Sequence, residues 1–200
     1  MTTRAAWDYI LKFIIIGDAS VGKSSLLVRL TEGRFMVDTD ATIGIEFGSH
    51  ILTLDSGERL KLQVWDTAGS EQFRSGAAGC LLVYDVTERD TFEHLPSWLY
   101  DVREQCEEGA TIALVGNMSD RPATQRRVSV DEAAEFAAAN DLLFFETSAK
   151  TGANVEAVFK AVAKAIIAQY AANPEAREQG TPGVSLATDT RDTAICCTVS

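Results

Sequence analysis

Short apolar runs alternate with amphipathic segments along most of the chain. The runs at 8–17, 80–86 and 111–116 are nearly continuous, which is typical of strands buried on both faces of a parallel sheet. A fourth run, at 142–145, fits the same interpretation. Apolar residues at helical spacing separate these runs, and they predict helices that begin near residues 23, 96, 130 and 155.

Two further strands flank a predicted hairpin turn at 55–58. Apolar and polar residues alternate from Leu60 to Trp65, and this register places Trp65 on the polar face, with Lys61 and Gln63. A large aromatic residue on a polar face indicates either a partner surface or a position that a neighbouring helix covers, and the sequence favours neither.

The alternation of strands and helices predicts an α/β fold. We expect a doubly wound, mostly parallel six-stranded sheet with helices on both faces and a ligand at the carboxyl ends of the strands. The predicted domain spans residues 1–171. From residue 172 to 200 the composition shifts to Pro, Gly, Ser, Thr and charged residues, which predicts a flexible tail.

Composition narrows the function classes. With 46% hydrophobic and 24% charged residues, the chain has enough apolar material for a core. Its net charge of −11 argues against nucleic-acid binding and against a polybasic membrane anchor. We expect neither a membrane-spanning helix nor a signal peptide. The four cysteines suggest no disulfide framework, so we expect reduced thiols in the cytosol.

The strongest motif is G-D-A-S-V-G-K-S at 17–24, a phosphate-binding loop (P-loop) of the form G-x-x-x-x-G-K-[ST]. A strand precedes it and a helix follows it, and this context disfavours the alternative of a simple glycine turn. Lys23 is expected to reach the terminal phosphates and Ser24 to bind Mg²⁺. The expected nucleotide contacts in this segment are Ala19, Ser20, Val21, Gly22, Lys23, Ser24 and Ser25.

A P-loop alone leaves kinases, ATPases and GTPases open. Asp66 and Gly69 follow a strand, where they are expected to reach Mg²⁺ and the γ-phosphate, and Thr42 is expected to supply a second hydroxyl to the metal. Asp120, near the end of the fifth strand, is expected to select guanine, because one carboxylate accepts both N1–H and the 2-amino group. The predicted base contacts are Asn117, Met118, Asp120, Ser148, Ala149 and Lys150.

With these segments in place, the chain resembles the Rab-type small GTPases of the Ras superfamily over residues 9–170 and at its terminus. The resemblance rests on T-I-G-I-E-F at 42–47, K-L-Q-V-W-D-T-A-G at 61–69 and L-V-Y-D-V-T at 82–87. It implies a monomeric GTP/GDP switch of vesicle traffic on the cytoplasmic face of intracellular membranes, with a cytosolic pool. It also implies an exchange factor, an activating protein, a prenylation escort and a GDI-type chaperone.

Residue roles follow from the same resemblance. The catalytic set is Lys23, Thr42, Gly69 and Ser70, and the Mg²⁺ ligands are Ser24, Thr42 and Asp66. The effector surface is expected to include Ile43, Gly44, Phe47 and Trp65. Near the terminus, Cys196 and Cys197 resemble a double-prenylation signal, and two lipids anchor a protein stably where one is marginal.

Three departures from the family pattern bear on mechanism. Ser70 replaces the glutamine that orients the attacking water, so intrinsic GTP hydrolysis is expected to be slow and to depend on an activating protein. Met118 replaces a lysine, which predicts weaker nucleotide binding with guanine preference retained. Between Ser75 and Gly76 the family has several more residues, so most of the second switch helix is not expected to form. Either the loop takes a short path or the next strand is pulled toward the nucleotide.

These departures leave a second hypothesis, a GTP-locked or nucleotide-weak pseudo-GTPase that acts as an interaction protein. A small nucleotide kinase is disfavoured, because no arginine-rich lid segment is visible. His50 and His94 have no partner spacing, and we interpret both as surface or core fillers.

Overall fold

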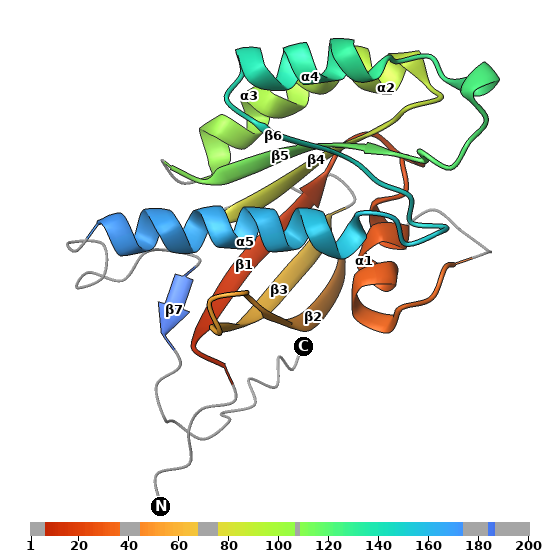
Figure 1. Ribbon diagram of the computed structural model, residues 1–200. Coiled ribbons are helices and arrows are strands. Elements are labelled where there is room, and N and C mark those ends of the chain that lie inside the picture. Colours follow the sequence, from red (N-terminus) through yellow and green to blue (C-terminus); the bar gives the residue numbers. More distant parts are fainter. Residues whose placement is uncertain (1–6, 37–44, 68–75, 107–108, 174–183, 187–200) are drawn as a thin grey trace, which may run out of the picture.

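The computed structural model describes residues 7–36, 45–67, 76–106, 109–173 and 184–186. Within these residues a central sheet lies between two layers of helices (Figure 1). The strands are β1 (Tyr9–Ile16), β2 (Ile45–Thr53), β3 (Arg59–Thr67), β4 (Gly79–Asp85), β5 (Thr111–Asn117), β6 (Leu143–Glu146) and β7 (Val184–Leu186). Their order across the sheet is β2-β3-β1-β4-β5-β6, with β7 paired to β1.

Only two of the described pairings are antiparallel, those of β2 with β3 and of β7 with β1. The first six strands therefore form the predicted doubly wound, mostly parallel sheet. Because β1 lies at the centre and its neighbours on both sides run parallel to it, the loops after β1, β3 and β4 meet at one edge of the sheet.

The helices are α1 (Lys23–Glu32), α2 (Arg89–Glu93), α3 (Leu95–Gln105), the short 3-10 helix η2 (Ala123–Gln125), α4 (Val130–Ala139) and α5 (Val155–Ala172). In Figure 1, α1 and α5 lie on one face of the sheet, whereas α2, α3 and α4 lie on the other. Among the described residues, no helix combines the length and the apolarity that a bilayer crossing would need.

Strand β1 contributes side chains to the core on both faces of the sheet, which explains its continuous apolar run. Leu11, Phe13 and Ile15 point toward α1 and α5, whereas Ile14 and Ile16 point toward α2, α3 and α4. All five side chains are essentially inaccessible to solvent. A strand covered on both faces needs apolar residues at consecutive positions, because successive side chains alternate between the faces.

Most local predictions are confirmed. The hairpin closes with Leu54 N donating to Glu58 O at 2.9 Å. The helix expected near Pro96 begins at Leu95, and the preceding turn is a separate helix, α2. The Ser129 hydroxyl caps α4 by accepting from Glu132 N at 3.1 Å, whereas the Glu132 carboxylate pairs with Arg89.

Strand β7 differs from the expectation that residues beyond 171 are a flexible tail. Tyr9, Ile10 and Leu11 pair with Leu186, Ser185 and Val184 in antiparallel register. Strand β3 occupies one side of β1 from Tyr9 to Ile15, and β4 pairs on the other side from Phe13 onward. The start of β1 is therefore not paired with β4, and β7 pairs with this part of the strand (Figure 1).

Candidate functional site

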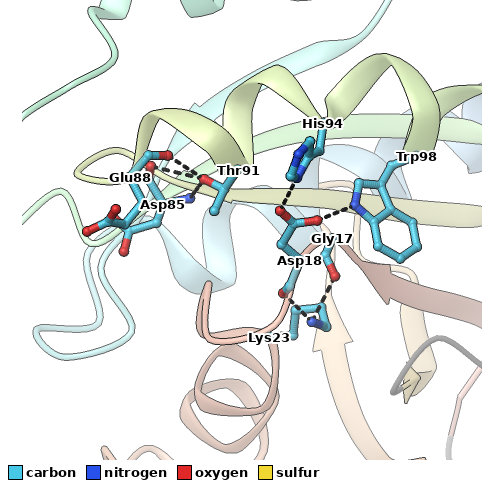
Figure 2. Close-up of polar contacts among 8 residues, drawn as sticks. All are labelled: Gly17, Asp18, Lys23, Asp85, Glu88, Thr91, His94 and Trp98. Atoms are coloured by element: carbon cyan, nitrogen blue, oxygen red, sulfur yellow. Dashed lines mark hydrogen bonds and ion pairs between the residues drawn. The ribbon is translucent and has the colours of Figure 1, made fainter.

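The P-loop connects β1 to α1 and wraps around the ammonium group of Lys23. Lys23 Nζ donates to Gly17 O at 2.9 Å and to Asp18 O at 2.7 Å (Figure 2). An ammonium group has three donors, so two of them hold the loop in shape. The charge of Lys23 is thus fixed over the start of the loop, where the sequence predicts phosphate binding.

Helix α1 begins without a side-chain cap and without an acidic residue in its first turn. The N-cap residue, Gly22, has no side chain that could accept from the N-terminal amides, and such amides together with the helix dipole favour an anion. Gly22 at the helix start has φ 91°, and a Cβ there would lie 2.4 Å from Asn117 Nδ2. The close approach of loop and Asn117 requires this glycine.

Asp66 is nearly inaccessible, at 1% exposure, although it is a carboxylate. Its Oδ2 accepts a short hydrogen bond from the Ser24 hydroxyl, whereas its Oδ1 is buried and has no hydrogen-bond partner among the described residues. Burial raises the pKa of Asp66, and it lowers the pKa of the neighbouring Lys23. A divalent cation would satisfy the orphaned oxygen, so the two predicted metal ligands that the structure describes fit Mg²⁺.

Asn117 joins the P-loop to the loop after β6. Its Nδ2 donates to Val21 O at 2.8 Å, and its Oδ1 accepts from Ala149 N at 3.2 Å and from Thr147 Oγ1 at 3.3 Å. The residue is buried, with 2% exposure. These bonds fix two segments, far apart in sequence, at the same edge of the sheet.

The predicted base-selecting carboxylate lies beside this junction. Asp120 Oδ1 accepts from the Ser148 hydroxyl at 2.7 Å, and Lys150 Nζ lies 3.9 Å from Asp120 Oδ2. The Asp120 side chain is 15% exposed, so it is held in place but still reachable. The structure therefore brings Asn117, Asp120, Ser148, Ala149 and Lys150 together, as the sequence predicts.

Met118, which replaces the family's lysine, lies between the P-loop and the base-selecting residues. It has a left-handed backbone, with φ 65°, which is unfavourable for a residue other than glycine. Its Cε lies 4.0 Å from the position that a Cβ on Gly22 would occupy. The side chain thus extends toward the P-loop with an apolar tip.

Sequence reasoning missed Arg29. This residue of α1 donates from Nε to Ala149 O at 2.7 Å and from Nη2 to Lys150 O at 2.6 Å. It therefore ties α1 to the loop that carries Ser148. An arginine in the last turn of a helix ordinarily suggests a dipole contact, and nothing in the spacing indicates a partner about 120 positions away.

The interpretation of His94 as a filler is wrong. His94 Nδ1 lies 2.6 Å from Asp18 Oδ2, and Trp98 Nε1 donates to Asp18 Oδ1 at 2.7 Å (Figure 2). Both carboxylate oxygens of this P-loop residue are thus bonded to residues of the α2–α3 segment. His94 and Trp98 are four positions apart, one helical turn, which is the one sequence signal that joins them.

Phe47 and Trp65, the described members of the predicted effector surface, lie side by side on β2 and β3. Their ring centroids are 4.8 Å apart. Phe47 is 52% exposed, whereas Trp65 is half-buried and packs partly against the core beneath α3. The Trp65 ring is thus partly covered and borders an exposed aromatic residue, and its role in a partner surface stays a prediction.

Ala19 and Ser20 are exposed on the P-loop and Ser25 is buried in α1, whereas seven other predicted site residues lie outside the described residues. They are Thr42, Ile43, Gly44, Gly69, Ser70, Cys196 and Cys197. Their roles stay predictions, as does the path of the chain at the shortened segment near Ser75.

Comparison with known families agrees with this geometry. A model of the Ras family matches residues 12–168, well over half of the chain. The matched region contains the P-loop, Asp66, Asn117, Asp120 and the loop after β6. Ras-family proteins in general bind GTP or GDP with Mg²⁺, hydrolyse GTP, and act through regulators and effectors. The chain therefore belongs to the Ras family of small GTP-binding switches.

Proposed function

We propose that this protein is a Rab-type switch of vesicle traffic that hydrolyses GTP slowly and depends on an activating protein. The observation that carries the proposal is the bridge made by Asn117, whose hydrogen bonds join Val21 of the P-loop to Ala149 of the loop after β6. These bonds thereby hold the proposed phosphate-binding loop and the proposed guanine-selecting loop close together.

The phosphates of GTP would lie on the uncapped first turn of α1. The amides there would donate to the phosphate oxygens, and Lys23, already anchored to the loop carbonyls, would direct its remaining donor toward the terminal phosphates. The anchoring matters because a preorganised charge stabilises a transition state without reorganising.

Mg²⁺ would be held by Ser24 and Asp66, with Thr42 as a further expected ligand, and would neutralise charge on the phosphates. At the other end of the site, Asp120 would accept the N1–H and 2-amino hydrogens of guanine. The Ser148 hydroxyl donates to the Asp120 carboxylate and would orient it toward the base. Adenine has neither donor at these positions and would leave the carboxylate unpaired.

Slow hydrolysis is proposed because a serine hydroxyl at position 70 is too short to orient the water that a glutamine would hold. Rab-activating proteins supply an arginine and a glutamine of their own by family resemblance, so stimulated hydrolysis is compatible with Ser70. The proposed anchor is a pair of prenyl groups on Cys196 and Cys197, with partners that recognise Phe47 and Trp65.

A second candidate, a pseudo-GTPase that binds nucleotide weakly and acts as an interaction protein, is favoured by Met118. Its apolar tip lies near the P-loop where the family's lysine would bring polar contacts. Single-turnover GTP hydrolysis with and without a matched Rab-activating protein separates the two. Acceleration supports the proposed switch, and its absence supports the pseudo-GTPase.

The first prediction tests nucleotide selection. Isothermal titration calorimetry of the full chain with Mg²⁺ should show binding of GDP and no comparable binding of ADP. The Asp120→Asn variant should lose at least about 100-fold in GDP affinity, because it removes an acceptor from two donors of the base. Xanthosine diphosphate, which carries an oxygen in place of the 2-amino group, should bind this variant better than GDP. Equal affinity of the unaltered protein for GDP and ADP would contradict the proposal.

A further inference from the structure

We infer that His94 and Trp98 are positioning residues that hold the start of the P-loop from the α2–α3 segment, and that His94 makes nucleotide retention depend on pH. This inference rests on the proposed nucleotide-binding function. It assigns a role to a cluster that phosphate binding, metal binding and base selection leave unused.

The cluster is built around the carboxylate of Asp18. One oxygen lies 2.6 Å from His94 Nδ1 and the other accepts from Trp98 Nε1 at 2.7 Å. Two donors on two oxygens fix both the position and the rotation of the carboxylate. The Asp18 side chain is 23% exposed, so water competes less for it than for an open surface group.

The donors themselves stand on a fixed base. His94 is the junction of α2 and α3: its N–H donates to Asp90 O, and its carbonyl accepts from Ser97 N and Trp98 N. Thr91 ties α2 to the end of β4, because its hydroxyl accepts from Asp85 N at 3.1 Å and donates to Glu88 O at 2.7 Å (Figure 2). The imidazole and the indole are therefore presented by a rigid corner, not by a free loop.

The same aspartate reaches the phosphate-binding lysine through its backbone. Asp18 O accepts from Lys23 Nζ at 2.7 Å, while the Asp18 side chain is held from above by His94 and Trp98 (Figure 2). A change in the side-chain contacts would let the Asp18 backbone rotate and shift the carbonyl that orients Lys23. A chain of contacts thus links α3, through Asp18, to the ammonium group of Lys23.

His94 supplies the pH dependence. The charged groups that act on it are the carboxylates of Asp18 on the P-loop and of Asp90 and Glu93 on α2. Glu93 is itself paired with Arg89, and Asp18 also interacts with Lys23. The hydrogen bond and charge of Asp18 raise the pKa of His94, and the two α2 carboxylates add to this. Because the folded protein holds the proton more tightly, the ion pair is fully present below the ordinary histidine pKa and is lost as pH rises through the raised value.

The experiment measures release of a fluorescent GDP analogue from the full chain, loaded with Mg²⁺ and chased with unlabelled GDP, between about pH 6 and pH 8. Release should accelerate about two- to fivefold as pH rises, a range set by the modest strength of an exposed ion pair. His94→Asn should flatten this profile, because the amide still donates to Asp18 but does not titrate. Trp98→Phe should speed release at every pH, about two- to fivefold, with the pH dependence retained.

His50→Asn is the matched control, since it removes the other histidine of the chain, on β2, and should keep the profile of the unaltered protein. A second readout needs no nucleotide: NMR titration should place the His94 pKa above its ordinary value and move it down in Asp18→Asn. A flat profile in the unaltered protein, an unchanged profile in His94→Asn, or an unraised His94 pKa would overturn the inference. Failure to bind any guanine nucleotide would instead reject the proposed function, while the NMR titration would still decide whether Asp18 and His94 are coupled.

Discussion

At the residue scale, Met118 shows how one substitution changes a site without removing it. Its backbone has φ 65°, so the chain keeps an unfavourable conformation there that places the side chain near Gly22. A thioether tip provides contact area but no donor for the P-loop or a bound nucleotide. The neighbouring Asn117 and Asp120 keep their hydrogen bonds, so we expect base selection and binding strength to be separable.

The second prediction follows from this separation. Met118→Lys should slow GDP release by about three- to tenfold, because an ammonium on a similar stem adds one or two polar contacts across the site. Stopped-flow release of a fluorescent GDP analogue measures the change, and the preference for GDP over ADP should persist. Met118→Leu is the control with a side chain of similar size and no donor, and it should release GDP at nearly the original rate. Equal rates for the lysine and leucine variants would contradict the prediction.

Single residues also mark the limit of what the sequence predicts. Asn117, Asp120 and Ser148 follow strands whose ends must meet at one edge, so their proximity could be predicted from the order of the elements. Arg29 and His94 could not, because their partners lie about 120 and 76 positions away and depend on side-chain direction. A sequence motif indicates the residues that contact a ligand. Residues that hold those positions in place from elsewhere in the fold, such as Arg29 and His94, are not part of such a motif.

At the element scale, α1 is fastened at both ends to what surrounds the site. Its first turn follows the P-loop, and in its last turn Arg29 holds the backbone carbonyls of Ala149 and Lys150. Arg29 also donates to Gly33 O, at the residue that ends the helix with φ 68°. We therefore expect movement of α1 to be coupled to movement of the loop after β6.

The third prediction tests this coupling. Arg29→Ala should accelerate GDP release by about three- to tenfold, since two backbone carbonyls of the loop lose their donor and the loop loosens. Arg103→Ala is the control: Arg103 on α3 donates to Asn140 O at 2.7 Å, likewise from an arginine side chain to a backbone carbonyl. The control should leave GDP release unchanged. Similar release rates in the two variants would show that Arg29 acts only on general stability.

Elements were predictable where periodicity and turn chemistry agreed. The alternation from Leu60 to Trp65 and the turn after Leu54 gave the antiparallel pair β2–β3, because both signals are local. Pro96 correctly indicated the start of α3, but the hydrophobic spacing gave no sign that Arg89–Glu93 form a helix of their own. Strand β7 was not predicted, because a strand of three residues forms only where another strand, here the start of β1, is available for pairing.

At the scale of the whole molecule, the predicted nucleotide site and strand β7 lie at opposite ends of the sheet. Lys23 follows the carboxyl end of β1, and Asp66 and Asn117 lie at the carboxyl ends of β3 and β5. The start of β1 lies at the opposite end, where β7 pairs with it. Because the core strands are buried on both faces, the two ends are joined by a rigid body of side chains.

The fourth prediction concerns that far end. Ser185→Pro should disrupt β7, since proline lacks the N–H that a strand ladder uses. Hydrogen exchange measured by mass spectrometry should then be at least about threefold faster in Tyr9–Leu11 and unchanged in Phe13–Ile16, which pair with β4. Thr190→Pro, beyond β7, is the control and should change neither segment. Unaltered exchange at Tyr9–Leu11 in the Ser185 variant would contradict the pairing.

If Cys196 and Cys197 carry the proposed prenyl groups, the position of β7 limits how far those groups can reach from the sheet. Cys196 is ten residues beyond Leu186, so a fully extended chain spans at most about 35 Å from the paired strand. Counted from Asn173 after α5, the same cysteine is 23 residues away, which allows about 80 Å. With β7 in place, the proposed prenyl groups would tether the end of the sheet at which β1 starts, opposite the edge that carries Lys23 and Asp120.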